Sequence, residues 1–141
     1  MVWDLDKQEA LEKNDPPARE VVKKWLNKKG YVAKDHPDKY AVDLVISDEK
    51  GFTFFVEVQR QGVWQREQFP YNAVRIFQRK DRYKNYFEGK VFFFILSYDL
   101  TQAFIVDSEK AIQEKYLVKS NTQPNAYYIP VADCTYVFIN H

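Results

Sequence analysis

The chain has 141 residues, 45% of them hydrophobic and 17% aromatic, and 21 basic against 20 acidic residues give a net charge of +1. This length fits one domain with a sizeable core, and the composition excludes a disordered chain. No apolar run approaches the ~20 residues that a membrane-spanning helix needs, so no membrane role is expected.

The near-neutral charge means that any nucleic-acid function depends on where the basic residues lie, because the bulk balance gives no support. The single cysteine, Cys134, excludes an internal disulfide framework and a cysteine-based zinc site. The N-terminal stretch "MVWDLDKQEALEKN" is charged throughout, unlike the apolar core of a secretory signal. We therefore expect a reducing, cytoplasmic setting.

Two helices are predicted in the first 30 residues. The stretch "WDLDKQEALEK" predicts a short amphipathic helix, and "NDPPARE" predicts the start of a longer one. In the longer helix Asp15 can cap the N-terminus, and Pro16 fits the first helical position, where its missing N–H costs nothing. Apolar residues recur at helical spacing until Gly30, which is expected to end the helix.

A hairpin is predicted in the middle of the chain. Residues 31–33 form a short strand, and residues 40–47 form a strand with an apolar face. The "DEKG" stretch at 48–51 is a turn whose glycine suits a left-handed conformation, and "FTFFVEVQ" at 52–59 is the partner strand. The irregular stretch 60–70 is long for a compact domain, which often marks a functional loop.

The remainder of the chain predicts one more long helix and a set of strands. Residues 72–87 are expected to be helical, with a buried apolar stripe, and "KVFFFILSYDL" at 90–100 is expected to be the central strand. The resulting fold class is α/β, with a central mixed β-sheet flanked by helices. The other expected elements are a strand at 101–107, a short helix at 108–117, and late strands at 126–130 and 135–140.

Two acidic residues stand out on the predicted hairpin. If the turn takes up one bulged residue, Asp43 lies directly across from Glu57, with Cβ atoms roughly 4.5–5.5 Å apart. A shift of one residue would put the two carboxylates on opposite faces. Because adjacent carboxylates repel, a compensating cation is expected, and Mg²⁺ is bound through one or two carboxylates plus waters, with the Val58 carbonyl as a further oxygen ligand. Mn²⁺ is expected to substitute for it, and the metal would acidify a bound water.

These residues resemble the PD-(D/E)XK nuclease superfamily, to which restriction endonucleases, Holliday-junction resolvases and phage exonucleases belong. The resemblance covers residues 18–100: an acid on a helix, "VD" on one strand, "EVQ" on the next, then a basic helix. It implies a restriction-endonuclease-like core of α-β-β-β-α-β order with extra C-terminal strands, and Mg²⁺-dependent hydrolysis of DNA. It also implies that Glu20 is the helix acid, which would hold an outer water of the metal, that Asp43 and Glu57 bind the metal, and that Gln59 occupies the usual lysine position.

The chain departs from the family pattern in two places. Val42 replaces the usual proline before Asp43, and the neutral amide of Gln59 replaces the lysine, so it can orient a water but cannot stabilise hydroxide by charge. Lys80, with Arg79 as second choice, is the predicted substitute. If neither reaches the metal, the alternative is an inactive nuclease-fold domain that serves as a nucleic-acid-binding or protein-interaction module.

DNA is the expected partner, through a basic stripe on the predicted second helix. Arg75, Arg79 and Arg82 fall at i, i+4 and i+7, so they share one helical face that suits phosphate contacts. The preceding loop adds basic and aromatic groups that can contact phosphates or stack on bases. A homodimer is expected, because cutting two strands needs two sites. The loop residues in this nucleic-acid-binding set are Arg60, Trp64 and Arg66.

Each of these assignments has an ordinary alternative. Asp43 can be an edge-strand charge that discourages aggregation, and Asp38 can take its place if the strand begins elsewhere. Glu20 can pair with Lys23 or Lys24 as a solvated helix charge. The basic stripe can be a solvated face, and the aromatic loop can pack on the core.

Overall fold

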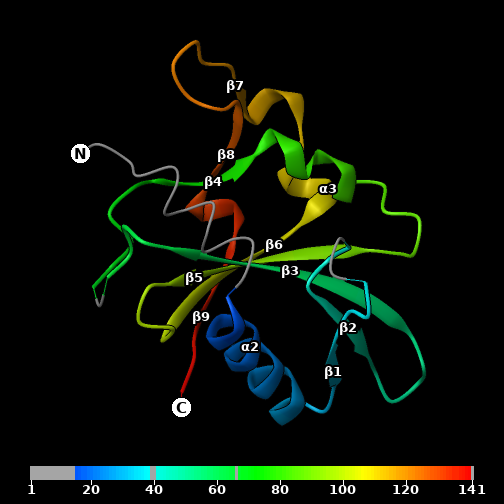
Figure 1. Cartoon of the computed structure of the whole chain (residues 1–141). Coiled ribbons are helices and arrows are strands. Elements are labelled where there is room, and N and C mark those ends of the chain that lie inside the picture. The colour runs from blue at the N-terminus through cyan, green and yellow to red at the C-terminus, as the bar shows by residue number, and fades with distance from the viewer. Residues whose placement is uncertain (1–14, 39–40, 66, 141) are drawn as a thin grey trace.

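The protein has an α/β fold with one six-stranded mixed sheet and one three-stranded sheet (Figure 1). This description comes from a computed structural model and covers residues 15–38, 41–65 and 67–140. The large sheet has the order β1-β2-β3-β5-β6-β9, and the small sheet has the order β4-β8-β7. The strands of the large sheet are β1 (Val32–Asp35), β2 (Leu44–Ser47), β3 (Thr53–Gln61), β5 (Val91–Ser97), β6 (Gln102–Asp107) and β9 (Thr135–Phe138). Those of the small sheet are β4 (Ala73–Phe77), β7 (Leu117–Val118) and β8 (Ala126–Pro130).

The helical elements are short except for one. The longest described helix is α2 (Pro16–Lys28), and none within the described ranges combines the length and apolar character needed to cross a membrane. The others are α3 (Ser108–Ala111) and the 3-10 turns η1 (Gln78–Tyr83), η2 (Glu114–Tyr116) and η3 (Val131–Asp133).

Helix α2 begins and ends where the sequence predicts. The Asp15 side chain accepts a hydrogen bond from the Ala18 N–H at 3.3 Å, Pro16 opens the first turn, and Gly30 follows the C-cap with φ of +96°. A left-handed φ suits glycine because it lacks a Cβ atom. The predicted helix at residues 3–13 lies outside the described residues.

The hairpin of β2 and β3 has the predicted register. Leu44 pairs with Val56, and Ser47 pairs with Thr53. The turn is closed by the Asp48 N–H, which donates to the Phe52 carbonyl at 3.0 Å, and Gly51 adopts φ of +84°. Regular pairing in β2 begins at Leu44, later than the predicted start at residue 40.

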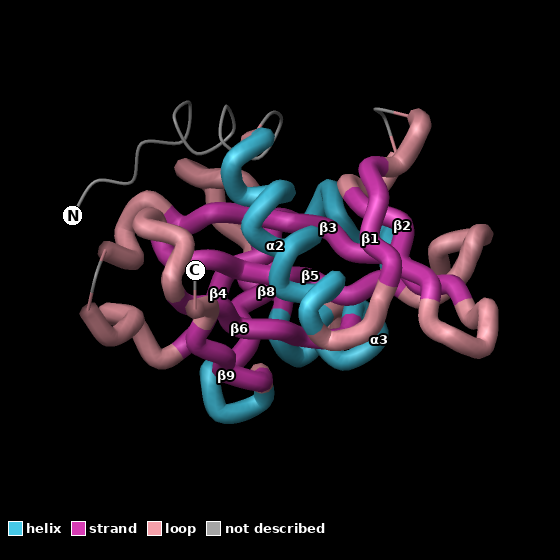
Figure 2. Tube along the Cα trace, turned by 90° about the horizontal axis from the view of Figure 1, so that it is seen from below, coloured by secondary structure: helices cyan, strands magenta, loops and turns pink. Residues whose placement is uncertain are grey.

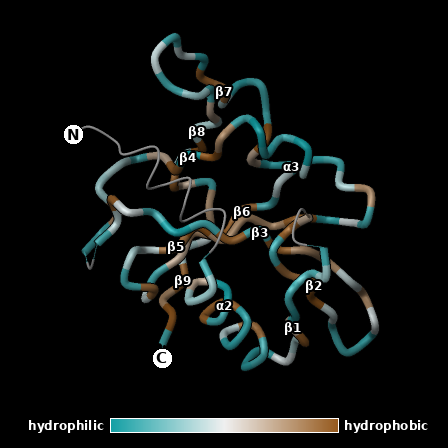
Figure 3. Tube along the Cα trace, in the orientation of Figure 1, coloured by the Kyte–Doolittle hydropathy of each residue, from teal (hydrophilic) through white to brown (hydrophobic). Residues whose placement is uncertain are grey.

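The central strands are buried because both faces of the large sheet are covered (Figures 1 and 2). Strand β5 runs parallel to β3 and antiparallel to β6, which confirms its predicted interior position. Helix α2 covers one face, where it contributes Ala18, Val22 and Leu26 to a core shared with β2 and β3. The small sheet and α3 cover the other face, and hydrophobic residues gather along the central strands between these layers (Figure 3).

The predicted second helix at 72–87 is wrong. The structure has strand β4 followed by the 3-10 turn η1, and β4 pairs antiparallel with β8, about 50 residues away in the sequence. Val74 and Ile76 are fully buried while Arg75 is half-buried, so the burial has a period of two, typical of a strand. The crossover from β3 to β5 therefore contains a strand and a short turn in place of the expected helix.

Candidate functional site: an acidic pair beside a buried lysine

Asp43 and Glu57 lie together at the end of the hairpin. The pairing of β2 with β3 ends at Leu44 and Val56, and its register puts the next residue, Asp43, opposite Glu57 on the face away from α2. The Asp43 Oδ2 atom accepts a hydrogen bond from the Val58 N–H at 2.7 Å, so a side chain caps β3 where regular pairing with β2 has ended. The Asp43 carboxyl lies close enough to the Glu57 carboxyl to help raise its pKa.

The Glu57 carboxyl is in a poor position to carry a negative charge. It is buried, with 7% of the residue exposed, and its pKa is raised to about 8. Burial is the main cause, the Lys80 charge opposes it, and the neighbouring Asp43 carboxyl adds to it. At neutral pH Glu57 therefore holds a proton unless additional positive charge stabilises its carboxylate.

Lys80 provides one positive charge at this site. Its Nζ atom lies 3.5 Å from the Glu57 Oε2 atom and donates to the Gln59 Oε1 atom at 3.1 Å. The lysine is 4% exposed, although it comes from the short turn η1. The predicted substitute for the motif lysine thus reaches both residues, and its chemical role stays a prediction.

Gln59 connects this site to the small sheet. The residue is 1% exposed, and its Nε2 atom donates to the backbone carbonyl of Arg75 at 2.9 Å. Its oxygen accepts from Lys80, so the amide is held at both ends. The sequence does not predict this contact with the Arg75 carbonyl, because it requires that β4 is a strand and that the small sheet packs on β3.

A cavity of about 310 Å³ lies against η1 and the residues that follow it. The Glu57 charge helps to raise the pKa of two of its lining residues, Arg82 and Tyr83. The Tyr83 ring is buried, and its pKa is raised to about 12, chiefly by burial and then by the Glu57 charge. Other residues at this cavity include Asp38, Ala41, Asn85 and Tyr86. Asp38, the alternative to Asp43, lines this cavity, and Asp43 is the residue that lies beside Glu57.

Glu20 does not join the acidic pair. Helix α2 covers the opposite face of the large sheet, and the Glu20 side chain is 56% exposed. It forms an ion pair with Lys23 at 2.6 Å, which is the ordinary alternative that the sequence allowed. The predicted acid from the first helix is therefore absent from the site, because the helix presents that side chain to solvent.

The loop residues predicted to contact nucleic acid are mostly structural. Trp64 is fully buried, stacks on Phe104 with ring centroids 4.9 Å apart, and donates from its Nε1 atom to a backbone carbonyl. The prediction that it stacks on bases is wrong, because the loop folds the ring into the core. Arg60 is held by Asp15, the α2 N-cap, at 2.6 Å. Arg66 lies outside the described residues.

The three arginines of the predicted basic stripe do not share a helical face. Arg75 lies on β4, while Arg79 and Arg82 lie on η1. Arg75 and Arg79 both pack against the Phe77 ring, at 5.1 and 5.2 Å from its centroid. Arg79 and Arg82 are exposed and lie on the same turn as Lys80, which contacts Glu57.

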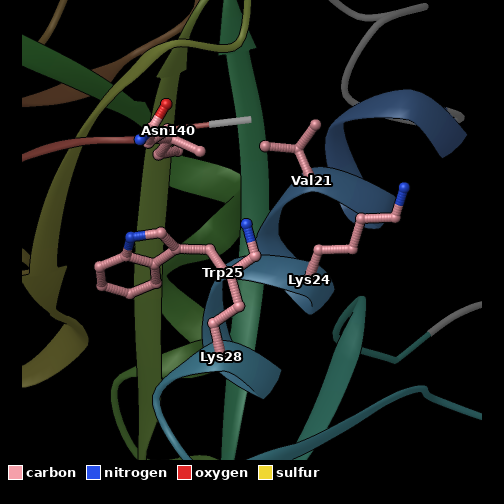
Figure 4. Close-up of a pocket in the computed structure, with 6 residues that line it drawn as sticks. Val21, Lys24, Trp25, Lys28 and Asn140 are labelled. Carbon is pink, nitrogen blue, oxygen red and sulfur yellow. The ribbon is translucent and has the colours of Figure 1, made fainter.

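A separate basic cavity of about 250 Å³ lies on the α2 side of the large sheet (Figure 4). Lys24, Lys28 and Trp25 line it from α2, and Asn140 faces them from the segment after β9. The acidic pair lies on the other face of the sheet. This cavity is therefore a distinct surface.

Comparisons with known proteins do not assign a function to the chain. No family model matches the chain, and a search of curated proteins finds no match. Among the residues described, no group of three or more His, Cys, Asp or Glu side chains is arranged to hold a metal ion. Any metal here would thus depend on two carboxylates and backbone or solvent oxygens.

Proposed function

We propose that the protein is a Mg²⁺-dependent DNA endonuclease of the PD-(D/E)XK type, with Mn²⁺ able to replace Mg²⁺. The observation that carries the proposal is the buried contact between Asp43 and Glu57, with Lys80 and Gln59 in direct contact on the same face. A structural ion pair needs only one carboxylate per ammonium. A second carboxylate beside the first raises the free energy of the folded state unless a further positive charge binds there.

The donor atoms fit a magnesium ion. Mg²⁺ binds hard oxygen ligands and usually keeps several waters, so one or two carboxylates are sufficient. Asp43 and Glu57 supply these, and the Val58 carbonyl adds a third oxygen. Because the N–H and C=O of a strand residue point to the same side, this carbonyl faces the side where Asp43 caps the Val58 N–H. Burial leaves little water to stabilise the charge of the Glu57 carboxylate, so a bound cation would stabilise it.

The residues around the pair have complementary roles in this proposal. A bound Mg²⁺ would supply a water of lowered pKa and stabilise charge on the phosphate. The Lys80 ammonium would stabilise negative charge that Gln59, a neutral amide, cannot. Gln59 would position Lys80 through their 3.1 Å hydrogen bond, and Arg79 and Arg82 on the same turn would hold DNA phosphates.

A plasmid-nicking assay with Mg²⁺ or Mn²⁺ tests the proposal. We expect wild type to nick supercoiled DNA, and Asp43→Asn and Lys80→Met each to lower the rate by on the order of 100-fold or more, the scale for loss of one preorganised charge-stabilising group. Glu20→Gln and Lys84→Met are matched controls, because both side chains are exposed, and both should nick like wild type. Nicking that survives Asp43→Asn would exclude this site.

The second candidate is a nuclease-fold domain that binds nucleic acid or a protein partner without cutting. It is favoured by one observation: Lys80 already partly compensates Glu57, at 3.5 Å, so the buried network can persist without a metal. This candidate predicts salt-dependent DNA binding with no cleavage of any DNA or RNA form. Binding lost in Arg79→Ala/Arg82→Ala would locate DNA at η1, whereas binding lost only in Lys24→Ala/Lys28→Ala would locate it at the cavity of Figure 4.

We also propose that two copies of the chain act together on duplex DNA, because one acidic site can cut one strand at a time. Sedimentation with a short duplex should give a complex with two protein chains. A complex with one chain that still makes double-strand breaks would contradict the dimer.

A further inference from the structure

A second cavity, of about 310 Å³, opens at the end of β3, between β4, β8 and the loop before β8. The lining residues that carry polar groups are Gln61, Tyr71, Asn72, Arg75, Gln123 and Tyr128. Among the described residues that line it there is no Asp or Glu. The cavity is thus neutral to slightly basic, with three carboxamides and two phenol rings.

The two tyrosines are placed to contact a ligand from solvent. Tyr71 is 48% exposed and Tyr128 is 37% exposed, so both rings are available at the cavity mouth. The Tyr71 ring also packs edge-on against Phe69, with centroids 5.9 Å apart, which fixes its orientation. Aromatic rings in this position favour a flat ligand, because stacking needs a planar partner.

The amides match the hydrogen-bonding edges of nucleobases. Each carboxamide carries a donor and an acceptor, which is the combination that pairs with the exposed edge of an unstacked base. Gln61 is 3% exposed, and the Gln123 Oε1 atom accepts a 3.4 Å hydrogen bond from Arg75, which also lines the cavity. A volume near 300 Å³ is at the small end for ligand pockets, which suits a single base.

The cavity and the acidic pair lie along the same face of β3, with the buried Gln59 between them. Glu57, Gln59 and Gln61 alternate with their neighbours and share one face of this strand. At about 3.3 Å per residue, Gln61 lies roughly 13 Å from Glu57, a distance that a nucleic-acid strand spans with a few nucleotides. The Gln59 amide also bonds to the backbone of Arg75, which lines the cavity.

We propose that this cavity binds one unpaired nucleobase of the strand whose phosphate lies at Asp43 and Glu57. The inference rests on the proposed nuclease function for that second contact, and it makes the substrate a nucleic acid with an unpaired base, including a duplex that is locally unpaired. Tyr71 and Tyr128 stack on the base, while Gln61 and Gln123 read its edge. The acidic pair then faces the backbone a few nucleotides away.

Binding of single-stranded DNA that carries one 2-aminopurine tests the site without requiring cleavage. In EDTA, wild type should quench the fluorescence at one position of the oligonucleotide, because stacking on tyrosine quenches this base. Tyr71→Ala and Tyr128→Ala should each remove most of the quenching and weaken binding roughly 10-fold, the scale of one stacked base. Gln123→Ala should weaken binding but retain quenching. Phe138→Ala is the control, since this ring is 63% exposed on the distant edge strand β9.

The outcomes separate this site from the nuclease proposal. Asp43→Asn should quench the 2-aminopurine fluorescence as wild type does. If the wild-type protein quenches the fluorescence but never nicks DNA, the proposal of the base site stands and the nuclease proposal fails. Unchanged quenching in both tyrosine variants would overturn the base site whatever the nicking assay gives. Equal affinity for free 2-aminopurine riboside would also overturn it, because the site would then be one for free nucleosides.

Discussion

The buried Glu57 carboxyl predicts an unusual dependence of stability on pH. In the folded chain its pKa is raised from 4.5 to about 8 by burial and by Asp43. At pH values between 4.5 and about 8, the folded state therefore holds a proton on Glu57 that the unfolded state has released. The stabilisation from this proton is fully present below pH 4.5 and is lost as the pH rises through 8. Without metal, the free energy of unfolding should fall across neutral pH.

The expected size follows from the pKa difference. One pKa unit corresponds to 1.36 kcal/mol, so between pH 6 and pH 9 the wild type should lose about 3 kcal/mol from this single group. The Glu57→Gln variant cannot ionise and should lack this term. Saturating Mg²⁺ should restore the wild type at pH 9 and leave the variant unchanged, because the cation replaces the proton only where both carboxylates remain.

Urea unfolding at several pH values, followed by the fluorescence of the buried Trp64, measures these free energies. The quantity to compare is wild type minus Glu57→Gln, in EDTA and in Mg²⁺, since the subtraction removes the contribution of other titrating groups. Glu20→Gln is the matched control, because that exposed carboxylate already pairs with Lys23, and it should follow the wild type. A difference that stays constant from pH 6 to 9 would refute the reasoning about the acidic pair.

Three further substitutions test assignments made from the fold. Trp64→Phe should lower the free energy of unfolding by on the order of 2 kcal/mol, because it leaves a cavity and removes a hydrogen bond. It should leave the Kd for DNA unchanged, because the ring is buried. A higher Kd in a binding assay would mean that Trp64 contacts the nucleic acid. Arg60→Ala should cost roughly 3 kcal/mol in urea unfolding, since it leaves the buried Asp15 carboxylate without its 2.6 Å partner. Gly89→Ala should lower the free energy of unfolding, measured by thermal unfolding, by about 1–3 kcal/mol, because φ is +147° and the new Cβ would lie 3.1 Å from the Phe55 ring. An unchanged stability would mean that the backbone at this position adjusts without strain.

Local patterns in the sequence were sufficient for the first helix and the acidic hairpin. Asp15, Pro16 and Gly30 define the ends of α2 through contacts within a few residues. The turn at Gly51 likewise determines which residues of β2 and β3 face each other, so the meeting of Asp43 and Glu57 follows from a stretch of 15 residues. Capping and turn chemistry act over such short distances that the chain order alone reveals them.

The second half of the candidate site depended on contacts that the sequence order conceals. Apolar residues at 73, 74, 76 and 77 fit a helix as well as a strand, and only pairing with β8 decides for the strand. That pairing puts the Arg75 carbonyl against Gln59 and leaves Lys80 on a short turn beside Glu57. Trp64 was misplaced for the same reason, because its burial requires Phe104 from a distant strand.

The sequence by itself placed two acids on neighbouring strands of one hairpin, since hairpin formation is a local property, and the structure decided the register in which they face one another. Only the tertiary structure decided which cations and amides surround them. Lys80 and Gln59 are brought together from segments 21 residues apart, while Glu20 is left in solvent on the far side of the sheet. Packing of one layer on another sets those neighbours, and no spacing along the chain encodes it.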